Sequence, residues 1–228
     1  MKKRVQVDSL ILSSTIILTG ALYLFPGLYS KNIWSDNIFD YLGFLALLLG
    51  VYLRMAARGY KKEFSRKGHG LVSNGLYAFV RNPMYLGSFL MGSGFLLIVW
   101  PWWALPIFAL AFYRRFNKQM IKEEKHLETL FGDEYRNYCK KTPRLFPEIK
   151  KIKKLKFSEV FPWDITWSTK EKRGLFLWPL LGILLETFQQ QVIFHQINVG
   201  QTIKIAVFAG IVFAISLKVL YRNNKNLK

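Results

Sequence analysis

The sequence predicts an all-α fold, a polytopic membrane bundle of about six transmembrane helices with amphipathic helices on its cytoplasmic side. The chain of 228 residues is 51% hydrophobic and 16% aromatic, and its apolar residues gather in runs. Several runs approach the roughly 20 residues that an α-helix needs to cross a bilayer. Two polar stretches, residues 75–87 and 123–144, flank a strongly apolar block, which places polar chemistry at a membrane surface.

The apolar runs are arranged as hairpins. Pro101, which stands between Trp100 and the pair Trp102 and Trp103, predicts a tight turn between two helices and an aromatic belt at the membrane interface. The first run follows MKKR without a small-residue cleavage pattern, so we expect an uncleaved first span. The six predicted spans are residues 9–29, 38–57, 83–100, 102–116, 174–194 and 201–221.

The positive charges predict the orientation. Of the 33 Lys and Arg residues, only Lys31 and Lys204 fall in the segments that we place outside. Cytoplasmic loops of membrane proteins carry an excess of Lys and Arg. We therefore expect a multi-pass membrane protein with both termini and both polar stretches in the cytoplasm. Membrane lipids are its expected partners, and the basic run 150–156 predicts contact with anionic lipid.

The composition argues against other partners. The net charge of +19 comes without a stacking platform or a groove-reading motif, so we expect no nucleic-acid partner. The single Cys139 excludes an intrachain disulfide. The histidines His69, His126 and His195 are far apart in sequence, and no second cysteine accompanies them, so we expect no metal site.

Arg81, Asn82 and Pro83 open the third predicted span. Proline is ordinary in the first turn of a helix, because its missing N–H would have no partner there. A helix N-terminus also directs free N–H groups and a positive dipole end at an anionic group. Arg81 adds a fixed charge at that position. The segment alone leaves a structural role and an anion-binding role open.

Glu123 and Glu124 follow the fourth predicted span. A lone glutamate pair is most often a solvated helix face, but this one comes just after a span that ends near Arg115. Gln119 and Glu123 are four residues apart, so they share one face of the helix. A carboxylate held there could accept hydrogen bonds from ribose hydroxyls or from an amine. Gly132 predicts the end of this helix.

Gly92 and Gly94 lie inside the third predicted span, on either side of Ser93. Small residues in membrane helices usually permit close helix packing. They also let a flat ligand approach the backbone. No strand precedes the motif and no third glycine follows in register, so it is not a soluble dinucleotide fingerprint.

Together these segments resemble the membrane methyltransferases of the isoprenylcysteine carboxyl methyltransferase and phospholipid N-methyltransferase group. The matching text is HGLVSNGLYAFVRNPMYLG, an apolar hairpin, and EEKHLETLFGDEYRNYCKKTPRLFP, within residues 69–147. The resemblance implies an integral-membrane enzyme that transfers a methyl group from S-adenosylmethionine to a lipophilic acceptor. The acceptor would be an isoprenylcysteine-type carboxylate or a phospholipid amine. We accordingly divide the chain into an N-terminal transmembrane hairpin (1–60), a cofactor-binding core (61–150), a basic cytoplasmic linker (151–173) and a C-terminal transmembrane hairpin (174–228).

The resemblance also assigns residues to the cofactor site. The donor's ribose would face Glu123, and its amino-acid carboxylate would face Arg81 or helix N–H groups. In phospholipid N-methyltransferases, G-x-G and E-E serve as cofactor motifs, and these would match Gly92–Gly94 and the pair Glu123 and Glu124. The family's other cofactor contacts carry onto His69, Gly70, Leu71, Val72, Tyr77, Asn82, Pro83, Met84 and Tyr85.

Two departures from the family pattern bear on the substrate. The family usually has histidine before the proline, where this chain has Asn82, which forms hydrogen bonds but does not titrate. Carboxyl methyltransferases place an arginine about four residues before the first glutamate, where this chain has Gln119, with Arg115 one turn earlier. Either Arg115 holds a substrate carboxylate or the acceptor is not a carboxylate. A phospholipid amine would need a general base, for which Glu124 is the nearest candidate.

Two other functions fit parts of the sequence. One is an NADPH-dependent membrane reductase that resembles the sterol C14-reductases, which share a tyrosine-rich helix followed by a proline turn. The other is a non-catalytic membrane scaffold, which predicts that neither cofactor stabilises the protein. The pairing of the RNPMY segment with two adjacent glutamates favours methyl transfer.

Overall fold

The computed structural model describes residues 17–29, 33–65, 70–148 and 174–194, with scattered positions between 199 and 214. The regular structure of these residues is helical throughout, and no strand occurs among them, so the all-α prediction is confirmed for this part of the chain. Residues 17–23 are helical. The later helices are α2 (Ile33–Phe64), α3 (Leu76–Phe79), α4 (Pro83–Val99), α5 (Ala104–Lys141) and α9 (Gly174–Gln189), with short 3-10 and π-helical turns at η1 (Pro26–Leu28) and η3 (Gln190–Phe194).

Among the described residues, one helix is long and apolar enough to cross a membrane, over Asn37–Phe64 of α2. It contains the predicted span 38–57. Helix α4 is apolar but has only 17 residues. The six-span topology stays a prediction. Residues 9–16 of the first predicted span, most of the last predicted span, the linker 151–173 and the basic run 150–156 lie outside the described residues.

The predicted hairpin at Pro101 is confirmed. Helix α4 begins with Pro83 in its first turn and ends at Val99, and α5 begins at Ala104. Trp102 and Trp103 are exposed on the turn, and the Trp102 ring stacks on Phe39 of α2 with ring centroids 6.4 Å apart. The turn is therefore braced against the neighbouring helix.

Helix α5 differs from the prediction in one respect. The sequence predicts a span at 102–116 followed by a separate amphipathic helix, but both belong to one element of 38 residues. Neither glycine nor proline occurs between positions 107 and 131, so nothing interrupts the backbone hydrogen bonds. The predicted break at Gly132 is confirmed, because its φ of 51° and ψ of −123° kink the helix there.

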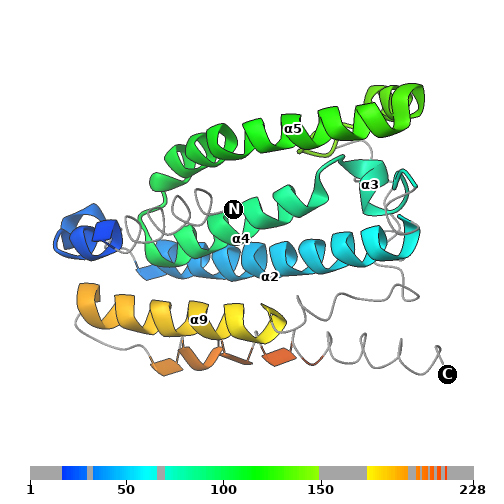
Figure 1. Cartoon of the computed structure of the whole chain (residues 1–228). Helices are drawn as coiled ribbons and strands as arrows, with labels where there is room; N and C mark the ends of the chain where they lie inside the picture. The colour runs from blue at the N-terminus through cyan, green and yellow to red at the C-terminus, as the bar shows by residue number, and fades with distance from the viewer. Residues whose placement is uncertain are drawn as a thin grey trace.

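Helix α4 is the middle layer of the bundle. It packs along α2 on one side and against α5 on the other, while α9 lies on α2 and also touches α4. Figure 1 shows this order, with α5 and α9 on opposite sides of the α2–α4 pair. The outer faces of α2 and α9 expose large apolar side chains, among them Ile38, Leu45, Leu184 and Phe188. An apolar outer surface of this kind is typical of a protein surrounded by lipid.

Two pairs of glycines set the close approach of α2 and α4. A Cβ atom on Gly94 would lie 2.5 Å from the carbonyl oxygen of Gly43, and one on Gly50 would lie 2.6 Å from that of Gly87. The glycines of each helix are seven residues apart, so both pairs lie on one face of an antiparallel contact. Small residues are what allow helix backbones to approach this closely in membranes.

Alanine substitutions at Gly75 and Gly132 separate the effect of backbone strain on stability from the effect of a steric clash. Both have positive φ, 57° and 51°, with ψ near −125°, a region that side-chain-bearing residues avoid. A Cβ on Gly75 would lie 2.0 Å from the Tyr60 ring, whereas one on Gly132 meets nothing within 4 Å. We expect Gly132→Ala to lower the free energy of unfolding by about 1–2 kcal/mol and Gly75→Ala to lower it further. Equal thermal unfolding midpoints for the two variants would contradict this.

Candidate functional site

The structure brings the two polar stretches into contact. The backbone N–H of Arg81 donates to the carbonyl of Pro143 at 2.9 Å, and that of Asn82 donates to the carbonyl of Arg144 at 3.1 Å. The segment before α4 therefore runs alongside the segment that follows α5. The stretches at 75–87 and 123–144 therefore form one region, although 62 positions separate Asn82 from Arg144 in the sequence.

Glu124 is the centre of this region. The Arg144 guanidinium donates to both carboxylate oxygens of Glu124, with Nη2–Oε2 at 2.5 Å, and Asn82 Nδ2 donates to Oε1 at 3.2 Å. A second guanidinium, that of Arg81, lies 3.6 Å from Oε1. The Glu124 side chain is only 12% exposed, so water screens these contacts little. Hydrogen bonding to Glu124 is the main cause that raises the pKa of Arg144.

The positive groups at the start of α4 are thus engaged within the protein. Arg81 pairs with Glu124 and also donates to Cys139 Sγ at 2.8 Å, and Arg144 donates to Asn117 Oδ1 at 2.9 Å. Pro83 has no N–H, and Tyr85 N–H bonds to the Asn82 carbonyl. The predicted anion site at Arg81 and the α4 N-terminus therefore coincides with an internal ion-pair network.

Glu123 lies beside this network on the exposed side of α5. Its Oε1 accepts hydrogen bonds from Tyr85 Oη at 2.8 Å and from Gln119 Nε2 at 2.9 Å. Gln119 and Glu123 share a face, as the spacing predicts. Both donors are neutral and meet one oxygen of an exposed carboxylate, so the geometry suits acceptance of further hydroxyl donors.

A row of aromatic rings leads from Glu123 along the α4–α5 contact. Tyr85 lies 5.5 Å from Phe116, which lies 4.4 Å from Phe112, and Phe112 lies 5.3 Å from Phe89, as measured between ring centroids. The guanidinium carbon of Arg115 stands 5.8 Å from the Phe116 ring centroid. The polar site therefore sits at one end of an apolar, aromatic seam.

Tyr77 connects the loop before α4 to both sides of the region. Its hydroxyl donates to the Ala57 carbonyl at 3.3 Å, and its own carbonyl accepts from Tyr138 Oη at 2.6 Å. Burial raises the pKa of the Tyr77 hydroxyl, and the charge of Glu123 raises it further. Burial likewise raises the pKa of Tyr138, so both phenols stay neutral at physiological pH. His69 lies outside the described residues.

Gly92 and Gly94 contact neighbouring helices instead of the polar region. A Cβ on Gly92 would lie 2.4 Å from the Phe108 ring of α5, and Gly94 abuts Gly43 and Leu47 of α2. The sequence leaves two roles open for these glycines, close helix packing and close approach of a ligand. The contacts in the structure support helix packing. Their match to a cofactor motif gains no support from the structure.

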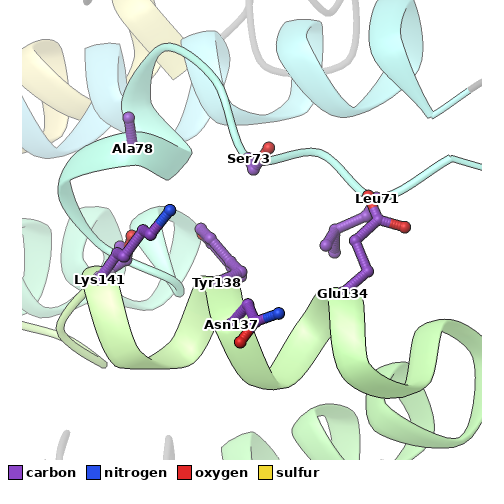
Figure 2. A pocket seen from close by; sticks show the side chains of 8 residues that line it. Leu71, Ser73, Ala78, Glu134, Asn137, Tyr138 and Lys141 are labelled. Atoms are coloured by element: carbon purple, nitrogen blue, oxygen red, sulfur yellow. The ribbon is translucent and has the colours of Figure 1, made fainter.

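A cavity of about 470 Å³ opens between the loop before α4 and the last turns of α5. Figure 2 shows Glu134 and Lys141 extending from α5 toward the wall formed by Leu71, Ser73 and Ala78, with Asn137 also lining the cavity. Of the predicted site residues that the structure describes, only Leu71 lines this cavity. The α5 residues lie at positions i, i+3 and i+7, so they share one face of the helix. The sequence shows this spacing, but only the tertiary structure shows that the face lies opposite the loop before α4 and lines a cavity.

Two further observations concern possible metal ligands and the residues that the sequence analysis did not identify. Within the described ranges, no group of three His, Cys, Asp or Glu side chains is placed to hold a metal ion. The network residues Arg144 and Asn117 were not singled out from the sequence. Their only signal there is that Arg144 follows a proline at the end of the second polar stretch.

Comparison with known proteins identifies relatives of this chain. Residues 38–134 match the family described as Phospholipid methyltransferase. The chain is 35% identical over 133 residues to protein-S-isoprenylcysteine O-methyltransferase of Schizosaccharomyces pombe, with 55% of this chain and 56% of the relative covered. It is 29% identical over 150 residues to the Xenopus laevis protein of that name (62% and 50% covered) and 32% over 129 residues to that of Saccharomyces cerevisiae (52% and 54%).

The chain spans about half the length of the curated relatives it matches. No solved structure matches it. The matched segment contains most of α2, all of α3 and α4, and most of α5, and thus both Glu123 and Glu124. The chain is therefore similar to the protein-S-isoprenylcysteine O-methyltransferases over about half of its length, and its residues 38–134 match the phospholipid methyltransferase family.

Proposed function

We propose that this chain is an integral-membrane methyltransferase that uses S-adenosylmethionine to methylate a lipophilic acceptor at the cytoplasmic membrane surface. The observation that carries the proposal is the junction of the two polar stretches at Glu124, which holds Glu123 beside Tyr85 at the end of the aromatic seam. The relatives named protein-S-isoprenylcysteine O-methyltransferase support it independently. The six-span topology with cytoplasmic termini is part of the proposal.

The residues present fit the donor. A carboxylate that already accepts from two neutral groups, as Glu123 does, suits a ribose diol. The adjoining cavity of about 470 Å³ falls in the usual size range of small-molecule sites, about 300–1,000 Å³. Tyr77 lies near both, because its carbonyl accepts a hydrogen bond from the cavity-lining Tyr138, and burial, with a smaller effect of the Glu123 charge, raises the pKa of its hydroxyl.

We propose an isoprenylcysteine-type carboxylate as the acceptor. The Glu124 carboxylate already accepts hydrogen bonds from Arg144 and Asn82 and lies beside Arg81, so it is engaged within the protein and is poorly placed to take a proton from an amine. A carboxylate nucleophile needs no general base. The exposed Arg115, above Phe116 and one turn before Gln119, is the side chain that we assign to the acceptor carboxylate. The aromatic seam offers an apolar surface to the lipid chain.

The protein's part in the reaction is then positioning. S-adenosylmethionine supplies a methyl group on a positively charged sulfur that already carries its leaving group. Glu123 fixes the donor's ribose, with Tyr85 and Gln119 holding the carboxylate in place. Arg115 directs the acceptor carboxylate toward the methyl group. Holding two reactants in line removes much of the entropic part of the barrier.

Glu123→Gln should raise the dissociation constant for S-adenosylmethionine about tenfold or more, since a hydrogen bond to a charged group is lost. Isothermal titration of the purified protein in detergent measures this. Glu128→Gln, on the same helix and exposed, is the control and should bind as the wild type does. Undiminished binding by Glu123→Gln would overturn the assignment of Glu123, and no binding by the wild type would overturn the proposed function.

Arg115→Gln should raise KM for a prenylated cysteine carboxylate about tenfold while it leaves donor affinity unchanged, because the lost contact is a charge-assisted hydrogen bond to the acceptor. Labelled methyl transfer into a prenylated cysteine and into phosphatidylethanolamine, compared side by side, measures this. The neighbouring exposed Arg114→Gln is the control. Transfer into the phospholipid alone would show that the acceptor is an amine.

A further inference from the structure

We infer that three exposed lysines on α5, Lys118, Lys122 and Lys125 (the lysine stripe), bind the anionic headgroups of the phospholipids that surround the protein. The stripe is separate from the basic run 150–156, which lies outside the described residues. The inference rests on the membrane placement in the proposed function. It concerns the surrounding lipid, and neither the methyl donor nor the acceptor.

The lysine stripe lies on one face of α5 and is directed away from the bundle. Its members are four and three residues apart, the spacing of neighbours on a helix surface, and all three are exposed. At 3.6 residues per turn they lie about 140–160° around the helix from Met120. The Met120 side chain is fully buried and clusters with Leu86 and Leu145. Figure 1 shows α5 as an outer helix of the described bundle, so the stripe faces the surroundings of the protein.

The same face of α5 is apolar nearer the start of the helix. Ile107 and Ala111 are exposed, and they precede Lys118 by eleven and seven residues, which is about three and two helical turns. An exposed apolar face of a membrane helix suits the hydrocarbon of the bilayer. One face of α5 therefore changes from apolar to cationic along its length. A bilayer changes in the same order, from its hydrocarbon interior to its charged headgroups.

The length of α5 puts the stripe at the inner headgroups in the proposed topology. The helix begins at Ala104, next to the exposed Trp102 and Trp103, which we expect at the outer interface. At about 1.5 Å per residue, Lys118 lies about 21 Å and Lys125 about 32 Å from that start. The hydrocarbon core is about 30 Å thick, so the stripe covers its inner boundary. Long lysine side chains extend from this depth to the phosphate groups.

The charges on α5 favour an anion from outside the protein. In the part of the chain that the structure describes, no ion pair involves the three lysines, and like charges four residues apart on a helix repel each other. Later in α5, Arg136 instead pairs with Glu128 at 2.8 Å and Asp133 at 3.2 Å, so that surface is neutralised within the protein. Anionic lipid supplies negative charge at the level of the stripe, where each lysine adds to the attraction.

Thermal unfolding in detergent with added lipid tests the inference. Dioleoylphosphatidylglycerol should raise the unfolding midpoint of the wild type about 5 °C more than dioleoylphosphatidylcholine does, because binding to the folded state stabilises it. A triple variant with Lys118→Gln, Lys122→Gln and Lys125→Gln should lose most of this difference. In the wild type, 0.5 M NaCl should also reduce the difference, since salt screens exposed charges.

A second triple variant, Lys61→Gln, Lys62→Gln and Lys140→Gln, is the matched control. It removes the same charge from exposed positions outside the stripe and should respond to both lipids as the wild type does. If the two triple variants lose the response equally, net charge attracts the lipid and the stripe does not. Circular dichroism checks that the variants fold, and the salt dependence of the wild type needs no variant.

Two further outcomes would overturn the inference. One is a wild type that responds alike to the two lipids. The other is a wild type that inorganic phosphate or heparin stabilises as much as phosphatidylglycerol does, since the stripe would then bind soluble anions. The assay contains neither methyl donor nor acceptor. A protein that responds to phosphatidylglycerol but does not bind S-adenosylmethionine would therefore contradict the proposed function and leave the lysine stripe intact.

Discussion

Glu124→Ala should abolish methyl transfer and lower the free energy of unfolding by about 2–3 kcal/mol, because it leaves two guanidinium groups without their shared carboxylate. Breaking a buried ion pair by removing one partner typically costs about 3–5 kcal/mol. The value expected here is lower, since the Arg144 side chain is 31% exposed and water can partly replace the lost partner. The thermal unfolding midpoint of the purified protein measures the effect.

The same helix offers a control for this prediction. Glu128 pairs with Arg136 at 2.8 Å, but both side chains are well exposed, at 44% and 61%. Exposed pairs contribute about 0–1 kcal/mol, so Glu128→Ala should change the midpoint little. A double variant, Glu124→Leu with Arg144→Met, should recover part of the lost stability because no unpaired Arg144 charge remains. If Glu124→Ala and Glu128→Ala unfold at the same temperature, the network does not hold the two stretches together.

Gly94→Leu should separate α2 from α4 and lower the free energy of unfolding by about 3 kcal/mol, with loss of activity. A Cβ on Gly94 would lie 2.7 Å from the backbone nitrogen of Leu47 and 2.5 Å from the backbone oxygen of Gly43. Because both are backbone atoms of α2, the clash can be relieved only if α2 and α4 move apart. Gly20→Leu is the matched control, because nothing lies within 4 Å of a Cβ there. The unfolding midpoint and the fraction of monodisperse protein measure the effect.

A smaller substitution at the same position, Gly94→Ala, decides between the two roles of Gly92 and Gly94. If they serve packing, Gly94→Ala should reduce stability and donor affinity together, or stability alone. If they form a cofactor motif, Gly94→Ala should weaken S-adenosylmethionine binding at unchanged stability. The second result would falsify the packing role that the contacts with Gly43 and Leu47 support.

Much of the local structure could be predicted from the sequence, since it depends on neighbouring residues. Pro83 marks the start of α4, Pro101 marks the turn, and Gly132 marks the kink, because each residue restricts or frees its own backbone. The four-residue spacing of Gln119 and Glu123 fixes their shared face. The prediction of a separate amphipathic helix was wrong, and the reason is again local. The sequence becomes less hydrophobic from Arg114 onward, but no residue there ends a helix.

The sequence by itself therefore determined the helices of the described residues, the hairpin turn and the two polar stretches that are candidates for the site, all of which follow from spacing and residue type. The tertiary structure alone decided which of those polar groups are left for a ligand. It paired Glu124 with Arg144, twenty positions away, and placed Gly94 against Gly43 of another helix. Such pairings depend on how helices pack, and packing responds to the whole surface of each helix and not to any short pattern.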